Sequence, residues 1–242
     1  MRGSAKHLTD VWFMAMVACL LTEADAGEVA DLPFKLTAGT YQVAGKTAGT
    51  DYNLRHSSEW GNLWVGHYHD QVAGYGQWRA GWDRSFGESL RILPSMQIAT
   101  GGFANGSVQA ETGEPYFVGI GFGRTNQRPY WNLNFDPNDS YMLSTGYRGT
   151  EGQSYVIQYV RDNREHPDQR HLHLVYRQST ENDRRITVDF LYKQGLVEDI
   201  LIRRWGLAVT HDWPRYFVRL AFDPKANFST DDMWRISIGT RF

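Results

Sequence analysis

The sequence contains a single cysteine, Cys19, among 242 residues. One thiol cannot form an intramolecular disulfide, and it excludes metal sites built on paired cysteines. The longest apolar run, residues 11–21, is much shorter than the roughly 20 residues that cross a bilayer as a helix. The formal net charge is only −2, so no general positive field attracts nucleic acid. These absences exclude a disulfide scaffold and a helical membrane protein, and they argue against a nucleic-acid partner.

Residues 1–26 have the parts of a secretory signal peptide. Two basic residues precede the apolar stretch at 11–21, and residues 24–26 (ADA) form an A-x-A cleavage site. The residues before Cys19 resemble a lipoprotein box only poorly, so we predict cleavage after residue 26. The exported chain would then contain no cysteine.

From about residue 50 onward, apolar and polar side chains alternate in segments separated by Gly, Asn, Asp and Pro. In residues 75–83, for example, Trp78 and Trp82 share one face, whereas Gln77 and Arg79 share the other. No stretch keeps a 3.6-residue apolar repeat, so we predict successive β-strands and no helix after the signal peptide.

Alternation alone shows only that one face of each strand is apolar, and a soluble β-sandwich gives the same pattern. Three features favour lipid on the apolar side. The segments have about 9–11 residues, the length of a tilted transmembrane strand. Aromatic residues gather at segment ends, as in interfacial girdles, and the polar faces are unusually charged. The sequence therefore predicts a membrane barrel.

The last ten residues, 233–242 (MWRISIGTRF), resemble the C-terminal strand of bacterial outer-membrane β-barrel proteins, the porin-like class. That strand typically ends in Phe after alternate apolar residues, and the barrel-assembly machinery reads it. Thr240 is a mild departure, and the resemblance points to the class without identifying a family. The residues that match this assembly signal are Trp234, Ile236, Ile238 and Phe242.

The resemblance implies a location in the outer membrane of a Gram-negative cell. The expected partners are outer-membrane lipids and lipopolysaccharide, the barrel-assembly machinery and small solutes, with no nucleic acid. The chain lacks the long inward loops of trimeric porins, which favours a monomer.

The predicted fold is all-β: a closed, antiparallel, up-and-down transmembrane β-barrel with short loops and no plug domain. Closure is required because hydrocarbon offers no water to pair the backbone groups of an open sheet edge. The predicted domains are the signal peptide at 1–26, an N-terminal extension or extra strand at 27–48, and the barrel at 49–242. No connection is long enough to form a plug, so only side chains and short turns should narrow the lumen.

We count fourteen candidate strands, and ten or twelve remain possible. The count includes a strand at 128–136 and one at 104–112, which is the least secure. A further strand at 35–45 would make fifteen, whereas single-chain bacterial barrels have an even number. We therefore interpret 35–45 as an extension, or as a sign that one weaker strand is misassigned.

The polar faces predict a lumen with more arginine than carboxylate. Rings of arginine favour anions, and guanidinium groups match carboxylate or sulfate groups on sugars. The alternative is that these arginines only neutralise carboxylates on neighbouring strands. The predicted lumen-lining residues are Arg79, Asp83, Arg91, His171, His173, Arg177, Arg185, Asp189, Arg204, Arg219, Arg235 and Arg241.

Two H-x-H pairs, at 67–69 and 171–173, could supply four nitrogens to a zinc-like ion. The pairs lie about a hundred residues apart on strands that are not sequence neighbours, so we favour polar wall residues and predict no metal and no cofactor. Residues 136–140 (DPNDS) have the oxygen donors that calcium accepts, but these residues are also ordinary turn formers, which is the interpretation we prefer.

Three functions remain open. The preferred one is a narrow channel for small, anionic or saccharide-like solutes, without enzymatic activity. The second is a lipid-modifying enzyme, such as a lipid A deacylase or phospholipase, which needs a Ser–His pair. The third is a structural or assembly partner of an envelope or polysaccharide-secretion system. The enzyme hypothesis has one candidate cluster: Ser57, Ser58, His67 and His69.

Overall fold

The computed structural model describes residues 32–43, 46–133, 136–197, 199–229 and 231–242. The signal peptide expected at 1–26 lies outside these residues. The described chain has one 3₁₀ helix, η1 (Ala226–Phe228), and fourteen strands. The strands are β1 (Phe34–Val43), β2 (Lys46–Ser58), β3 (Gly61–Asp70), β4 (Tyr75–Asp83), β5 (Leu90–Ala99), β6 (Phe103–Thr112), β7 (Tyr116–Thr125), β8 (Ser140–Arg148), β9 (Gln153–Asp162), β10 (Arg170–Thr180), β11 (Arg184–Val197), β12 (Ile200–Asp212), β13 (Tyr216–Asp223) and β14 (Met233–Arg241).

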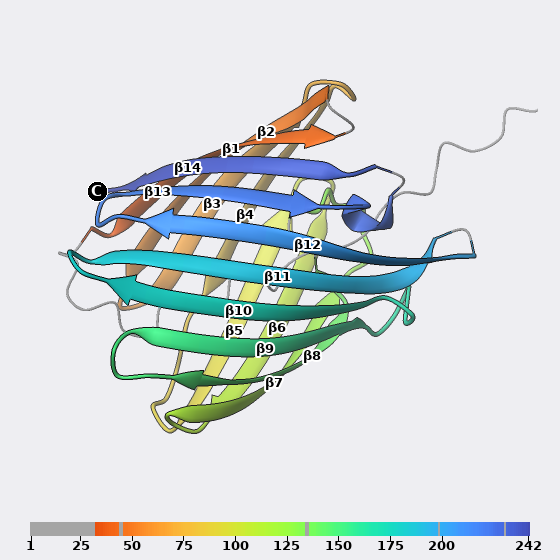
Figure 1. Ribbon diagram of the computed structural model, residues 1–242. Coiled ribbons are helices and arrows are strands. Elements are labelled where there is room, and N and C mark those ends of the chain that lie inside the picture. Colours follow the sequence, from red (N-terminus) through yellow and green to blue (C-terminus); the bar gives the residue numbers. More distant parts are fainter. Residues whose placement is uncertain (1–31, 44–45, 134–135, 198, 230) are drawn as a thin grey trace, which may run out of the picture.

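The strands form one closed antiparallel barrel (Figure 1). Each strand pairs with its sequence neighbours, and β1 pairs with β14 from Lys35 opposite Arg241 to Val43 opposite Met233. Because the ladder returns to its start, each of the fourteen described strands has a pairing partner on both sides. The predicted up-and-down barrel of about fourteen strands is confirmed. None of the helical turns among the described residues has the length and apolar character needed to span a bilayer.

The second interpretation of residues 35–45, that they form a strand and one weaker predicted strand is misassigned, agrees with the structure. The segment 128–136 is wrong as a strand, since its described residues form a connection between β7 and β8. Residues 34–43 form β1 and close the sheet, so this segment is a strand and not an extension. The barrel therefore begins before residue 49, which falls within β2. The least secure predicted strand, at 104–112, is present as β6.

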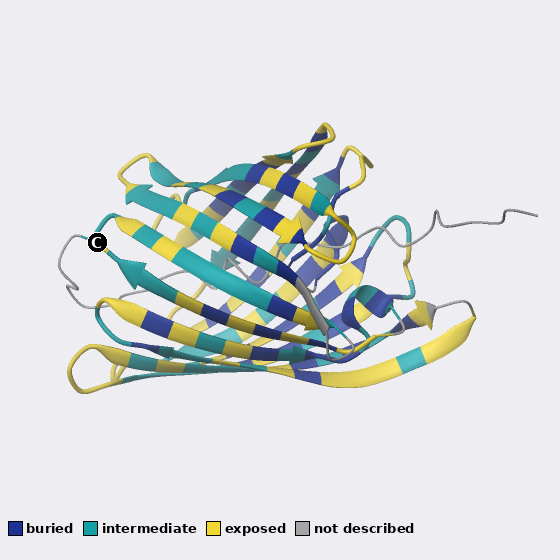
Figure 2. Cartoon of the chain, turned by 90° about the horizontal axis from the view of Figure 1, so that it is seen from above, coloured by how far each residue is buried: buried dark blue, intermediate teal, exposed yellow. Residues whose placement is uncertain are grey.

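The outer surface of the barrel is apolar along its whole circumference. Exposed and buried residues alternate along the strands, as Figure 2 shows. On β7, Val118 and Ile120 are 58% and 62% exposed. Every strand contributes at least one exposed large apolar side chain: Leu36, Leu54, Val65, Trp78, Ile98, Val108, Ile120, Leu143, Ile157, Leu174, Phe190, Leu207, Leu220 and Ile236.

An apolar band of this extent is much larger than the patches that soluble monomers expose. It matches the lipid-facing belt of transmembrane barrels. The apolar residues of the C-terminal strand follow the same rule, because Trp234, Ile236 and Ile238 all point outward. The fold and this exterior support the predicted outer-membrane location.

The two ends of the barrel differ in the length of their connections. The end that holds Phe34 and Phe242 has connections of two to six residues, such as 59–60 and 84–89. The opposite end carries the longest connections, 126–139 and 224–232. Because periplasmic turns are short and extracellular loops longer, we assign the end with Phe242 as periplasmic and the opposite end as external.

An arginine at the middle of the apolar band should destabilise the barrel in a way that depends on depth. Ile120→Arg, near the middle of β7, should lower the free energy of unfolding in lipid by about 2–4 kcal/mol. Leu36→Arg, near the periplasmic end of β1, should lower it by about 0–1 kcal/mol. Denaturant titration in phospholipid vesicles, followed by tryptophan fluorescence, measures both values. Equal losses at the two positions would contradict the assigned depth.

Candidate functional site

Two adjoining cavities lie inside the described part of the barrel. The first has a volume of about 320 Å³ and is bounded by β1–β5 and β10–β14. The second has a volume of about 810 Å³, is bounded by β5–β11 and reaches the periplasmic turns at 113–115 and 149–152. Both are lined by Val175, Arg177 and Arg185. The two spaces therefore adjoin along β10 and β11.

Most of the side chains expected in the lumen line one of these cavities. Arg177 and Arg185 line both, and Arg91 lines the second. The first cavity also has Arg79, Asp189, Arg219, Arg235 and Arg241.

The remaining expected residues do not line either cavity. Asp83 is buried and accepts hydrogen bonds from Arg55 at 3.1 Å and from Asn62 at 2.7 Å. His171 and His173 are buried beneath the connection 126–139. Arg204 is exposed, because β13 pairs with β12 only from Leu207 onward and the β11–β12 hairpin extends past its neighbour. At the position of Arg204, the inward-facing side of β12 therefore no longer borders an enclosed space.

The sequence prediction missed four charged residues that line the first cavity: Lys35, Asp51, Arg55 and Asp212. Lys35 lies in the segment 35–45, for which the sequence leaves an extension and a strand both open, so no face can be assigned to it. The other three follow the same two-residue alternation and could have been found from it. Asp212 accepts a hydrogen bond from Arg241 at 2.7 Å, and Asp51 accepts one from Arg79. Some lumen arginines therefore do neutralise carboxylates, as the alternative hypothesis predicted.

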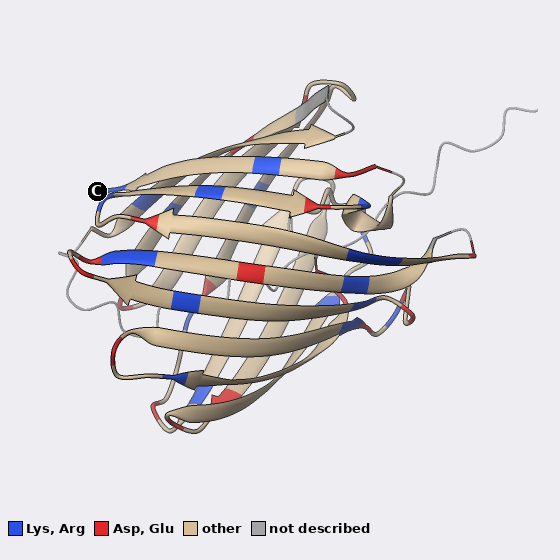
Figure 3. Ribbon diagram, viewed as in Figure 1, with Lys and Arg blue, Asp and Glu red and all other residues tan. Residues whose placement is uncertain are grey.

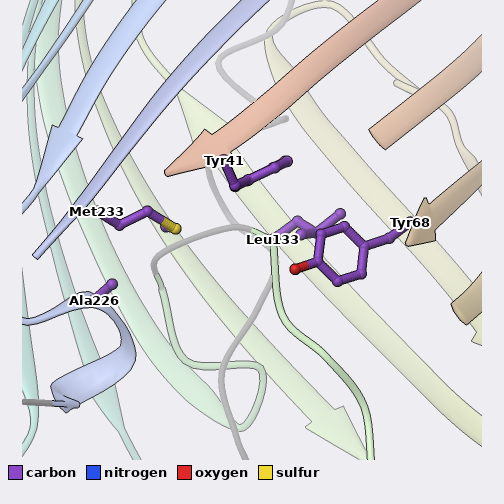
Figure 4. Packing of buried hydrophobic residues seen from close by; sticks show 5 residues of the cluster. All are labelled: Tyr41, Tyr68, Leu133, Ala226 and Met233. Atoms are coloured by element: carbon purple, nitrogen blue, oxygen red, sulfur yellow. The ribbon is translucent and has the colours of Figure 1, made fainter. Parts of the chain in front are cut away.

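The connection between β7 and β8, residues 126–139, folds into the external end of the barrel; we call it the lumen loop. The structure describes its residues 126–133 and 136–139. Leu133 of this loop packs in a buried cluster with Tyr41, Tyr68, Ala226 and Met233, which Figure 4 shows. The prediction that only side chains and short turns narrow the lumen is wrong. The aromatic and apolar residues that suggested a strand instead pack against the inner wall.

Two aromatic contacts extend this packing. The ring of Trp131 stacks on Tyr68 with a centroid distance of 5.8 Å and an interplanar angle of 7°. The ring of Tyr130 stacks on Phe103 at 4.1 Å and 15°. The loop thus packs three side chains, the buried Tyr130 and Leu133 and the half-buried Trp131, against β1, β3 and β6.

Polar wall residues hold the backbone of the lumen loop. Gln77 on β4 donates to the carbonyl of Trp131 at 2.9 Å and accepts from its N–H at 2.8 Å. Arg235 on β14 donates to the carbonyl of Leu133 at 2.9 Å. Gln97 on β5 donates to the hydroxyl of Tyr130. Burial raises the pKa of Tyr130, so this hydroxyl stays neutral. These bonds satisfy backbone groups that would otherwise be buried without partners.

The end of the lumen loop is fixed by its oxygen-rich segment. Asp139 accepts hydrogen bonds from the N–H of Thr125 at 3.0 Å, from its hydroxyl at 2.6 Å and from Arg164 at 2.8 Å. Asn138 accepts one from Asn105 at 2.8 Å. Both residues serve as anchors in a turn, in agreement with the interpretation preferred from the sequence.

Asp136 of the lumen loop meets two histidines of β10. Its Oδ1 lies 2.7 Å from Nδ1 of His171 and 2.9 Å from Nε2 of His173. Nδ1 of His173 lies 3.0 Å from Oδ1 of Asp189 on β11. Burial by itself raises the pKa of Asp136, but His173 and His171 outweigh it and hold the pKa below its ordinary value. The carboxylate therefore stays ionised although it is almost completely buried.

The other H-x-H pair and the candidate serines are not brought together. On β3, Val65 and His69 are exposed and His67 shares their outward face, so the four histidines do not form one set. His67 lies opposite Tyr52 in the β2–β3 ladder, and Ser57 is five residues further along β2. Ser57 instead donates a hydrogen bond to Asn62. The Ser–His pair that a lipid-modifying enzyme requires is not formed by these residues.

No protein-family model matches the sequence, and no curated protein matches it. Among solved structures, the chain is similar to the outer membrane protein Omp33 of Acinetobacter baumannii, with a TM-score of 0.53 and 12% identity, over 87% of this chain and 98% of that one. It is also similar to the NanC porin (TM-score 0.46, 7% identity, 86% of this chain and 100% of that one). The chain is similar to the KdgM porin as well (TM-score 0.44, 10% identity, 86% of this chain and 99% of that one). The likeness to Omp33 concerns the fold, which is that of bacterial outer-membrane barrels, as the C-terminal strand implied.

Proposed function

We propose that this chain forms a narrow outer-membrane channel for small anionic solutes, including acidic saccharides. The observation that carries the proposal is the lining of the first cavity, which has eight basic side chains and three carboxylates. Figure 3 shows basic residues along β10–β14, with the acidic residue of β11 between them. The basic residues are Lys35, Arg55, Arg79, Arg177, Arg185, Arg219, Arg235 and Arg241, and the carboxylates are Asp51, Asp189 and Asp212.

The excess of basic side chains is what gives the cavity its expected selectivity. Even if every carboxylate neutralises one cation, the lining keeps a positive charge. A closed wall of low dielectric focuses the resulting potential on the lumen. A planar guanidinium can donate two parallel hydrogen bonds to a carboxylate or sulfate, which favours such groups over a simple halide.

The size of the enclosed space supports small solutes. The cavities of about 320 and 810 Å³ lie in the range of about 300–1,000 Å³ that holds a drug-sized ligand. The lumen loop reduces the opening at the external end, because Tyr130 and Leu133 line the first cavity. A solute would therefore have to pass this loop to reach the basic side chains that line the first cavity.

Recordings in planar lipid bilayers test the proposal. The purified chain should produce discrete conductance steps, and under a potassium chloride gradient the reversal potential should show preference for chloride. Adding a sugar acid should reduce the chloride current by occupying the same lumen, whereas the uncharged parent sugar should reduce it less. Heat-denatured protein in the same detergent is the control. An absence of steps over repeated insertions, or cation preference, would contradict the proposal.

A further inference from the structure

We propose that Asp136, His171 and His173 form a binding site for a divalent cation of the zinc class at the external end of the lumen. None of the three ligands lines the first cavity, and the inference goes beyond a role in solute passage. Its test measures metal binding, so its failure would leave the proposed channel function untouched.

Three donors from distant parts of the chain meet at one point. One oxygen or nitrogen from each side chain lies within 4.8 Å of the others. His171 and His173 point to the same side of β10 because side chains alternate along a strand. The lumen loop then brings the carboxylate of Asp136 between them. All three are buried, with relative exposures of 1% for Asp136, 1% for His171 and 5% for His173.

The donor set has the chemistry that zinc prefers. Zinc binds imidazole nitrogen and carboxylate oxygen at about 2.0–2.2 Å, so two ligand atoms of a tetrahedral site lie ~3.3 Å apart. Oδ1 of Asp136 now lies 2.7 Å from His171 and 2.9 Å from His173. Each of these two distances would therefore have to increase by roughly half an ångström to admit an ion between the carboxylate oxygen and the two ring nitrogens. Binding would release the protons that these nitrogens now share with the carboxylate.

The surroundings include an outer partner of the kind that metal-binding histidines use. Nε2 of His173 faces Asp136, and its other nitrogen, Nδ1, lies 3.0 and 3.1 Å from the carboxylate oxygens of Asp189. A histidine held between a metal and a second carboxylate has a fixed ring orientation and a more basic ligand nitrogen. Only His173 has this partner, since Nε2 of His171 has none among the described residues.

The neighbouring residues keep the position dry and its charge balanced. The ring of His171 stacks on Phe228 with a centroid distance of 5.7 Å. The nearby Lys193 is buried, but its ammonium group is paired with Asp223 at 2.5 Å. An ion at this position would join the lumen loop to β10 and so hold the loop across the external end. The same contacts without an ion are a hydrogen-bonded anchor, and experiment can distinguish the two.

Isothermal titration calorimetry of the full chain, without a histidine tag and in detergent, tests the site with zinc chloride. Wild type should bind one ion per chain, and cobalt(II) should give the visible absorption of a nitrogen–oxygen site. Asp189→Asn should weaken zinc affinity by about 10–100-fold, because it removes only the outer partner. Asp136→Asn removes a charged ligand and should weaken affinity more than Asp189→Asn does.

The matched control is the double variant His67→Ala/His69→Ala, which removes the outward H-x-H pair and should bind zinc as wild type does. Heat-dependent mobility in gel electrophoresis reports whether each variant forms a folded barrel. If Asp136→Asn does not fold, the zinc affinity of Asp189→Asn and the cobalt spectrum of wild type decide whether the site binds a metal ion. No stoichiometric binding by wild type, or equal affinity in wild type and both aspartate variants, would overturn the proposal and leave a hydrogen-bonded anchor.

Discussion

Replacing residues 127–138 with a short glycine–serine linker should raise the single-channel conductance several-fold. The lumen loop fills the external end of the barrel with Tyr130, Trp131 and Leu133, and its backbone is held by Gln77 and Arg235. Barrels of eight strands are filled by side chains, whereas barrels of 16–18 strands leave an aqueous channel. A fourteen-stranded barrel lies between these sizes, so an inserted loop has a large effect on its open cross-section.

The replacement should leave the barrel itself intact. The β7–β8 ladder pairs Tyr116 with Tyr147 at one end and Gly123 with Ser140 at the other, outside the replaced segment. Bilayer recordings measure the conductance of wild type and variant under the same salt. A control replaces residues 71–74, an exposed external turn, with glycine and serine at equal length and should leave conductance unchanged. If the loop variant conducts like wild type, the lumen loop does not limit the current.

Replacing Arg177, Arg185 and Arg219 together with glutamine should lower the permeability of chloride relative to potassium several-fold. These residues on β10, β11 and β13 line the first cavity, and two of them also line the second. The substitution removes three of the eight basic groups while all three carboxylates remain. The reversal potential under a salt gradient should therefore move towards the value for no selectivity.

The effect of these arginines should be largest in dilute salt. The Debye length is about 10 Å at 0.1 M salt but about 3 Å at 1 M, so concentrated salt screens the lumen charge. Arg204→Gln is the matched control, because Arg204 is exposed on the hairpin beyond the lumen. An equal shift in Arg204→Gln would mean that surface charge sets the selectivity. No shift in the triple variant would argue against an anion-selective lumen.

Local patterns were sufficient to predict the wall of this barrel. The alternation that places Ile236 and Ile238 on one face of β14 and Arg235 on the other is visible in consecutive residues. The same rule located most arginines of the lumen. Residues 34–43 also have a good strand pattern, and the strand number stays even with them in the barrel because the described residues of 128–136 form a connection.

The lumen loop could not be predicted in the same way. Residues 130–133 have an aromatic and apolar pattern that also suits a strand. They fold inward because Gln77, 54 residues away, bonds the backbone of Trp131, and Arg235, 102 residues away from Leu133, bonds its carbonyl. Nothing in the local sequence specifies partners at such separations.

By itself, the sequence determined the class of fold. Alternating segments of about 9–11 residues with aromatic ends and charged polar faces place the apolar face of each strand towards lipid, and backbone pairing then requires closure. Only the tertiary structure decided what lies inside. It placed Asp136 between His171 and His173, left Arg204 beyond the rim and turned His67 and His69 outward. The physical reason is that strand alternation is a property of neighbouring residues, whereas the contents of a lumen depend on which distant side chains the register of fourteen strands brings face to face.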